Sequence, residues 1–129
     1  MVEKYHVSWD QVDAFIEKVI DRYKDVEDLS GVYGVPRGGY FLAGLLSEKM
    51  DIAWLVAPHK NCIVIDDIAD TGETLIHYDR NSSGLDGRKK YHIVTMYYNE
   101  QLSKVVPECY YDLKTDRWIV FPWEHKEKV

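Results

Sequence analysis

The sequence predicts an open α/β sheet, mostly parallel and flanked by helices. Strand signals and helix signals alternate along the chain, which is the order that builds strand–helix–strand units. The segment 62–65, Cys-Ile-Val-Ile, is apolar at every position, as expected of a strand covered on both faces. A chain of 129 residues is the usual size of one domain, so we expect a single domain over residues 1–129.

The first helix is predicted from its N-terminal signals. Ser8 and Gln11 form a Ser-x-x-Gln capping box, which satisfies free N–H groups at a helix start. Apolar residues then recur at helical spacing as far as Tyr23. We expect this helix to end before the polar residues 25–28.

The later elements follow in alternation. Strands are predicted at 31–35, 52–56, 62–65, 91–98 and 118–121, and helices at 40–50 and from within 66–74 to about 79. The polar segments 81–90 and 124–129 are predicted to be a surface loop and a frayed tail.

Composition excludes several classes of protein. Hydrophobic residues make up 46% and charged residues 29%, a balance that excludes a wholly disordered chain. The net charge is −6, so no basic excess is available to bind nucleic acid nonspecifically. No apolar run is long enough to span a membrane, and residues 1–6 hold no apolar signal core. We expect a soluble, cytoplasmic protein.

Metal binding through histidine and cysteine is not indicated. The two cysteines are far apart, and neither a Cys-x-x-Cys nor a His-Glu-x-x-His motif occurs. Cys62 opens an apolar strand, where a buried structural thiol is expected.

The segment 62–75 carries the strongest functional signal. An apolar strand leads into two acids, then into a turn with Thr71, Gly72 and Thr74, then into a helix. In open α/β sheets ligands bind beyond the carboxyl ends of strands. A strand–turn–helix junction also presents free N–H groups and a helix dipole to an anion. The turn therefore predicts a phosphate-binding loop.

Four acids surround this turn: Asp66, Asp67, Asp70 and Glu73. They would repel a bare phosphate, so the ligand should also bring hydroxyl groups or a divalent cation. Adjacent residues cannot share one face of a regular strand, so we expect Asp66 and Asp67 at the strand end, where the backbone turns. There they can bind a vicinal diol, directly or through Mg²⁺. The alternative is that the acids are caps and solvated charges, but their number exceeds capping needs.

Residues 65–74, Ile-Asp-Asp-Ile-Ala-Asp-Thr-Gly-Glu-Thr, resemble the 5-phosphoribosyl 1-pyrophosphate (PRPP) motif of type I phosphoribosyltransferases. Segments 5–10, 35–39 and 118–124 resemble the xanthine–guanine/hypoxanthine branch in the same order, so the likeness covers nearly the whole chain. It implies a Mg²⁺-dependent enzyme of purine salvage. Such an enzyme transfers phosphoribose from PRPP to a purine base of the 6-oxo class, releases pyrophosphate, and forms a homodimer or higher homo-oligomer.

The resemblance also implies roles for single residues. Asp66 and Asp67 would hold the ribose hydroxyls and Mg²⁺. The 5-phosphate loop would consist of Asp70, Thr71, Gly72, Glu73 and Thr74. Asp70 would be the acid/base that faces the purine imidazole. Its alternative role is that of a loop cap.

Two further segments match the family. Residues Pro36, Arg37, Gly38 and Gly39 resemble the pyrophosphate loop, which often contains a cis peptide; here that bond would join Pro36 to Arg37. Without the resemblance, the segment would be a glycine turn with an exposed arginine. Trp118 resembles the residue that stacks on the purine, and Ile119 would line the same pocket. In isolation, a tryptophan on a strand is more typical of a core.

The sequence departs from the family at two places. Residues 52–61 lead almost directly into the strand at Cys62, so the expected fold has a reduced hood and no long flexible loop to cover the reacting centre. Asn99 takes the place of a lysine that contacts the 6-oxo group in this branch, and Lys104 is a candidate to compensate for the missing charge.

Two other functions remain open from the sequence. One is a regulatory protein that binds PRPP or a nucleotide with little turnover, which the missing loop favours. The other is a retroviral-type aspartic protease, because residues 70–72 read Asp-Thr-Gly. The protease would require an all-β chain.

Overall fold

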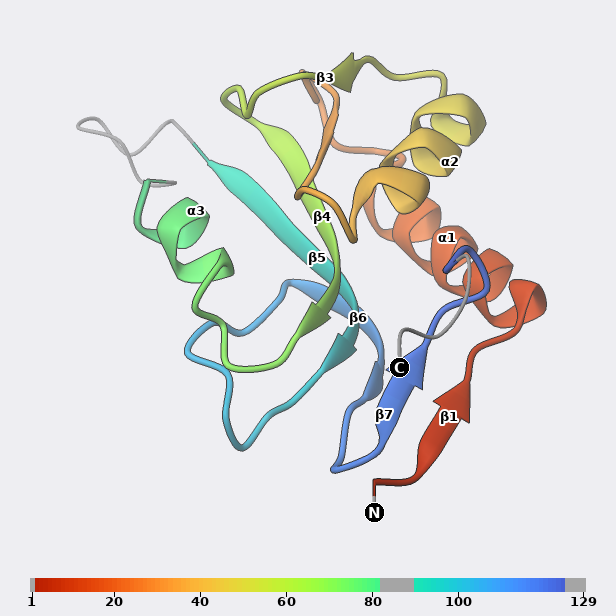
Figure 1. Cartoon of the computed structure of the whole chain (residues 1–129). Coiled ribbons are helices and arrows are strands. Elements are labelled where there is room, and N and C mark those ends of the chain that lie inside the picture. Colours follow the sequence, from red (N-terminus) through yellow and green to blue (C-terminus); the bar gives the residue numbers. More distant parts are fainter. Residues whose placement is uncertain (1, 82–89, 125–129) are drawn as a thin grey trace.

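The structure is a computed structural model, and it describes residues 2–81 and 90–124. Its main sheet has five parallel strands in the order β3-β2-β4-β5-β6 (Figure 1). These strands are β2 (Val32–Gly34), β3 (Trp54–Leu55), β4 (Cys62–Ala69), β5 (Tyr91–Tyr98) and β6 (Cys109–Leu113). A separate parallel pair joins β1 (Lys4–His6) to β7 (Trp118–Val120). The predicted open parallel α/β sheet is confirmed.

In the described part of the chain, three helices cover the main sheet. The helices α1 (Trp9–Tyr23) and α2 (Tyr40–Met50) lie on one face, and α3 (Leu75–Asn81) lies on the other (Figure 1). The predicted capping box is present: Gln11 N donates to Ser8 Oγ at 3.1 Å, and Ser8 N donates to Gln11 Oε1 at 2.9 Å. This helical content excludes the all-β protease.

The core lies on both faces of β4 and β5. All residues of β5 are buried, and Cys62 and Cys109 are both buried and form no disulfide in the described ranges. The register pairs Ala69 of β4 with Tyr98 of β5, and Tyr98 with Leu113 of β6. Because these three strands end together, the segments that follow them meet at one edge of the sheet.

The structure corrects the predicted end of one strand. β4 continues to Ala69 instead of ending at Ile65, so Asp66 and Asp67 lie inside the strand and not in a turn. Pairing with β2 does stop at Ile65, but pairing with β5 continues from Asp66 onward. The neighbouring strand on one side is enough to keep the chain extended past the acids.

Two short strands were not predicted. β1 has three residues and, within the described ranges, pairs with β7 alone; β6 is an edge strand that contains Asp112. The segments 81–90 and 124–129 fall almost entirely outside the described residues, so the loop and the tail stay predictions. In the described ranges, no helix is long and apolar enough to cross a membrane.

Candidate active site

Two cavities open at the carboxyl edge of the main sheet, and Asp70 lines both. The large pocket has a volume of about 510 Å³ and is lined by Asp70, Asn99, Glu100, Gln101, Leu102, Leu113, Lys114, Thr115 and Asp116. The small pocket has a volume of about 120 Å³ and is lined by Asp66, Ile68 and residues 70–75. The large pocket has the volume typical of a small-molecule site.

The small pocket begins at a pair of buried acids in β4. Burial raises the pKa of Asp66 to about 9, and the adjacent Asp67 charge adds to the increase. Burial also raises the pKa of Asp67. Each carboxylate accepts a bond from the next backbone N–H, at 2.8 Å from Asp67 N and 2.7 Å from Ile68 N. Without a ligand the pair therefore holds a proton that a cation would displace.

The acid pair fits a magnesium ion only with help from the substrate. The described residues contain no group of three or more side chains placed to hold a metal. Mg²⁺ prefers oxygen ligands and is often held by one or two carboxylates together with water and substrate phosphates. Asp66 and Asp67 supply such carboxylates, so PRPP and water would provide the remaining ligands.

The loop over residues 70–74 lines most of the small pocket. Gly72 has a φ of +81°, and a Cβ at this position would lie 2.7 Å from Lys104 N. The backbone is braced by Lys104 N, which donates to Thr71 O at 2.9 Å. Within the described part of the chain, the N–H groups of Gly72 and Thr74 have no hydrogen-bond partner. Such donors suit an anion, and since α3 has only seven residues, the loop itself would supply most of the contacts.

One acid of this loop is neutralised by a lysine. Lys104 Nζ donates to Glu73 Oε1 at 2.7 Å, and this contact lowers the pKa of Glu73. Both side chains are exposed. The pairing reduces the repulsion that Glu73 would otherwise exert on a phosphate in the small pocket.

The loop 36–39 reaches the acid pair from β2. Its Pro36–Arg37 peptide is cis, as the resemblance implied. A Cβ at Gly38 would lie 2.6 Å from Asp67 Cγ, so only glycine lets the loop approach this closely. Arg37 is exposed, and its guanidinium has no ion-pair partner in the described ranges. The loop therefore brings its backbone at Gly38 beside Asp67 and carries an exposed arginine, a residue that suits a pyrophosphate.

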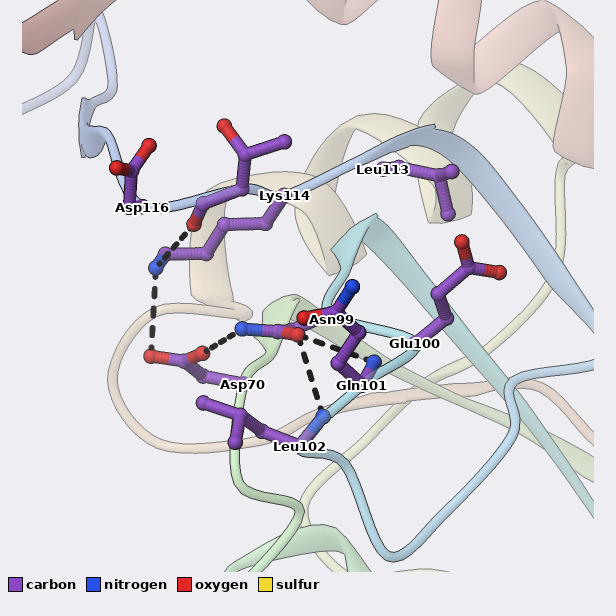
Figure 2. Close-up of a pocket in the computed structure, with 9 residues that line it drawn as sticks. Asp70, Asn99, Glu100, Gln101, Leu102, Leu113, Lys114 and Asp116 are labelled. Atoms are coloured by element: carbon purple, nitrogen blue, oxygen red, sulfur yellow. Dashed lines mark hydrogen bonds and ion pairs between the residues drawn. The ribbon is translucent and has the colours of Figure 1, made fainter.

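Asp70 lines both pockets. It is held by side chains that directly follow β5 and β6 (Figure 2). Asn99 Nδ2 donates to Asp70 Oδ1 at 3.0 Å, and Lys114 Nζ lies 3.5 Å from Asp70 Oδ2. Asn99 Oδ1 accepts bonds from the N–H groups of Gln101 and Leu102, both at 3.2 Å. The Asn99 oxygen and one of the two hydrogens of its amide nitrogen are thus used by protein groups.

The structure separates the residues predicted to bind the base. Trp118 is 62% exposed on β7, and Ile119 is buried in the core. Neither lines the large pocket, so their roles at the base stay predictions. Sequence reasoning missed Lys114, because the strand that ends beside it, β6, was not predicted.

No protein-family model matches the sequence. Solved structures do match over nearly the whole chain. A purine phosphoribosyltransferase from Pyrococcus horikoshii Ot3 superposes with a TM-score of 0.80 and 27% identity, covering 98% of this chain and 97% of that chain. The fold is that of the type I phosphoribosyltransferases.

Other phosphoribosyltransferase-like structures match at lower identity. A xanthine–guanine–hypoxanthine phosphoribosyltransferase from Helicobacter pylori has a TM-score of 0.77 and 20% identity, covering 97% of this chain and 95% of that chain. A hypothetical protein from Neisseria gonorrhoeae with bound ppGpp has a TM-score of 0.67 and 13% identity, covering 96% and 90%. The chain thus resembles the purine branch, while similar folds also hold other nucleotides.

Proposed function

We propose that this protein transfers phosphoribose from PRPP to a purine base and releases pyrophosphate. The observation that carries the proposal is the sharing of Asp70 by the large and small pockets. A base in the large pocket and a 5-phosphate in the small pocket would place the ribose between them, over the acid pair. This is the arrangement that a nucleotide product requires.

In this reaction an imidazole nitrogen of the purine forms a bond to the anomeric carbon as the bond from that carbon to pyrophosphate breaks. The nitrogen loses its proton to the carboxylate of Asp70, which borders the base and the ribose. General base catalysis of this kind contributes roughly 10²–10⁴-fold to a rate.

The leaving pyrophosphate is assigned to the loop 36–39. Arg37 can form paired hydrogen bonds to phosphate oxygens, and the N–H of Gly38 has no partner in the described ranges. Asp66 and Asp67 would hold the ribose hydroxyls. Mg²⁺, when bound, would neutralise charge on the departing group.

A PRPP- or nucleotide-binding regulator is the second candidate. The connection from Leu55 to Cys62 is too short for a covering loop, and such loops exclude water from reacting centres. The bound ppGpp in the Neisseria gonorrhoeae structure makes a nucleotide sensor a concrete alternative. Homo-oligomerisation, a single domain over residues 1–129 and a cytoplasmic location stay predictions.

The test is a panel of hypoxanthine, guanine, xanthine, adenine and orotate with PRPP and Mg²⁺, read by nucleotide formation. We expect nucleotide from at least one purine and none from orotate. Exchange of labelled pyrophosphate into PRPP in the presence of purines separates the two candidates. Tight PRPP binding without exchange for any base would favour the regulator.

A further inference from the structure

Lys114 is the only basic residue among the nine described residues that line the large pocket. It directly follows β6, and its N–H donates to Tyr98 O at 2.8 Å, which fixes its backbone to the end of β5. Its side chain is only 13% exposed. A cation with so little access to water favours an acceptor inside the pocket.

The contacts of the Lys114 ammonium in the structure are long. Its ammonium lies 3.5 Å from Asp70 Oδ2 and 3.2 Å from Thr115 O (Figure 2). A charge-assisted hydrogen bond is usually about 2.7–2.9 Å long. An ammonium group has three donors, so Lys114 can offer a shorter bond to a ligand without releasing Asp70.

The two residues considered from the sequence are placed differently. The Asn99 amide is bonded to Asp70 through its nitrogen and to two backbone N–H groups through its oxygen. Lys104 pairs with Glu73, is 55% exposed, and does not line the large pocket. Among the described residues that line the large pocket, Lys114 therefore remains the one cation that can face a base.

We propose that Lys114 determines which base is accepted, by donating a hydrogen bond to an exocyclic oxygen of the purine. An ammonium group can only donate, so it binds a carbonyl oxygen and opposes an exocyclic amine at the same position. Lys114 would thus select oxopurines against aminopurines. The residue that reads the base would then lie directly after β6, and not at the end of β5 where Asn99 lies. This assignment rests on the proposed function, because it needs the base to lie in the large pocket.

The test measures binding of product nucleotides, so it does not depend on turnover. Calorimetry compares inosine 5′-monophosphate, adenosine 5′-monophosphate and ribose 5-phosphate on the parent, on Lys114→Met and on Lys114→Arg. Met keeps the length of the side chain, and Arg keeps its charge. Lys49→Met is the matched control, since Lys49 lies on α2 and pairs with Glu17 at 3.8 Å.

We expect the parent to bind the inosine nucleotide roughly 10- to 100-fold more tightly than the adenosine nucleotide, as for a hydrogen bond to a charged group. Lys114→Met should lose this preference and keep its affinity for ribose 5-phosphate, while Lys114→Arg should retain part of the preference. The control should behave as the parent.

Two results would overturn the assignment in distinguishable ways. If Lys114→Met binds ribose 5-phosphate normally and keeps the full preference for inosine nucleotide, Lys114 does not read the base although the phosphoribose site stands. If the parent itself binds neither ribose 5-phosphate nor either nucleotide, the proposed function fails, and the role of Lys114 fails with it. Unchanged ribose 5-phosphate binding also shows that a variant is folded.

Discussion

The buried pair Asp66 and Asp67 leads to a prediction about how the free energy of unfolding depends on pH. The pKa of Asp66 is raised from its ordinary value of 3.8 to about 9, chiefly by burial. A raised pKa means that the folded state binds the proton more tightly than the unfolded state does. The stabilising contribution is therefore complete below about pH 4 and is lost as the pH rises toward 9. Asp66→Asn removes this titration while keeping the shape of the side chain.

The size of the effect follows from linkage. One proton held only by the folded state changes the free energy of unfolding by about 1.4 kcal/mol per pH unit. Between about pH 5 and about pH 7 the parent should therefore lose up to about 3 kcal/mol relative to Asp66→Asn. Urea unfolding curves in a metal-free buffer, at several pH values, measure this difference. Some slope should persist in the variant, because burial also raises the pKa of Asp67.

The control for this series is Asp13→Asn, an exposed position on α1, which should keep the pH slope of the parent. Added Mg²⁺ with PRPP should stabilise the parent more as the pH rises, because binding displaces the proton. Equal slopes for the parent and for Asp66→Asn would refute the buried, protonated pair.

Two further predictions concern the neighbouring loop. Asp70→Asn should lower kcat by roughly 10²–10⁴-fold and leave PRPP affinity within a few-fold of the parent. Steady-state kinetics measures kcat, and calorimetry measures PRPP affinity. An unchanged kcat would mean that the role of Asp70 is structural. Gly72→Ala should destabilise the fold by about 1–2 kcal/mol, because Gly72 has a φ of +81°, and weaken ribose 5-phosphate binding. Its control is Gly44→Ala in α2, where the nearest atoms to a Cβ belong to the exposed Trp54 ring. Equal losses in both variants would contradict the role of the turn.

Much of the fold could be predicted because its signals are local. The capping box at Ser8 and the apolar spacing after it locate α1 without any tertiary information. β5 was predicted over its full length since it is a continuous β-prone segment. β1 was missed because it is short and is stabilised by β7, a strand distant in sequence. β6 was missed because it is a short edge strand whose pattern is interrupted by Asp112.

The difference between local signals and contacts distant in sequence also explains which site residues could be predicted. The loop 70–74 and the loop 36–39 are contiguous in sequence, so a motif can identify them. Lys114 and Asp70 are far apart in the chain and meet only because β4, β5 and β6 end at the same edge. No local pattern marks Lys114, and the missed β6 removed the only structural clue to it.

The contacts of Asp70 bear on whether the protein is a catalyst or a regulator. A loop cap bonds to nearby backbone N–H groups. Asp66 and Asp67 make such local bonds within β4, each to the N–H of the residue that follows. In the described part of the chain, Asp70 bonds to no backbone N–H; its partners are the side chains of Asn99 and Lys114. Its side chain is 47% exposed between the two pockets. The two side chains that directly follow β5 and β6 thus orient a carboxylate that caps no backbone N–H of its own loop. This arrangement fits the proposed proton acceptor better than a loop cap.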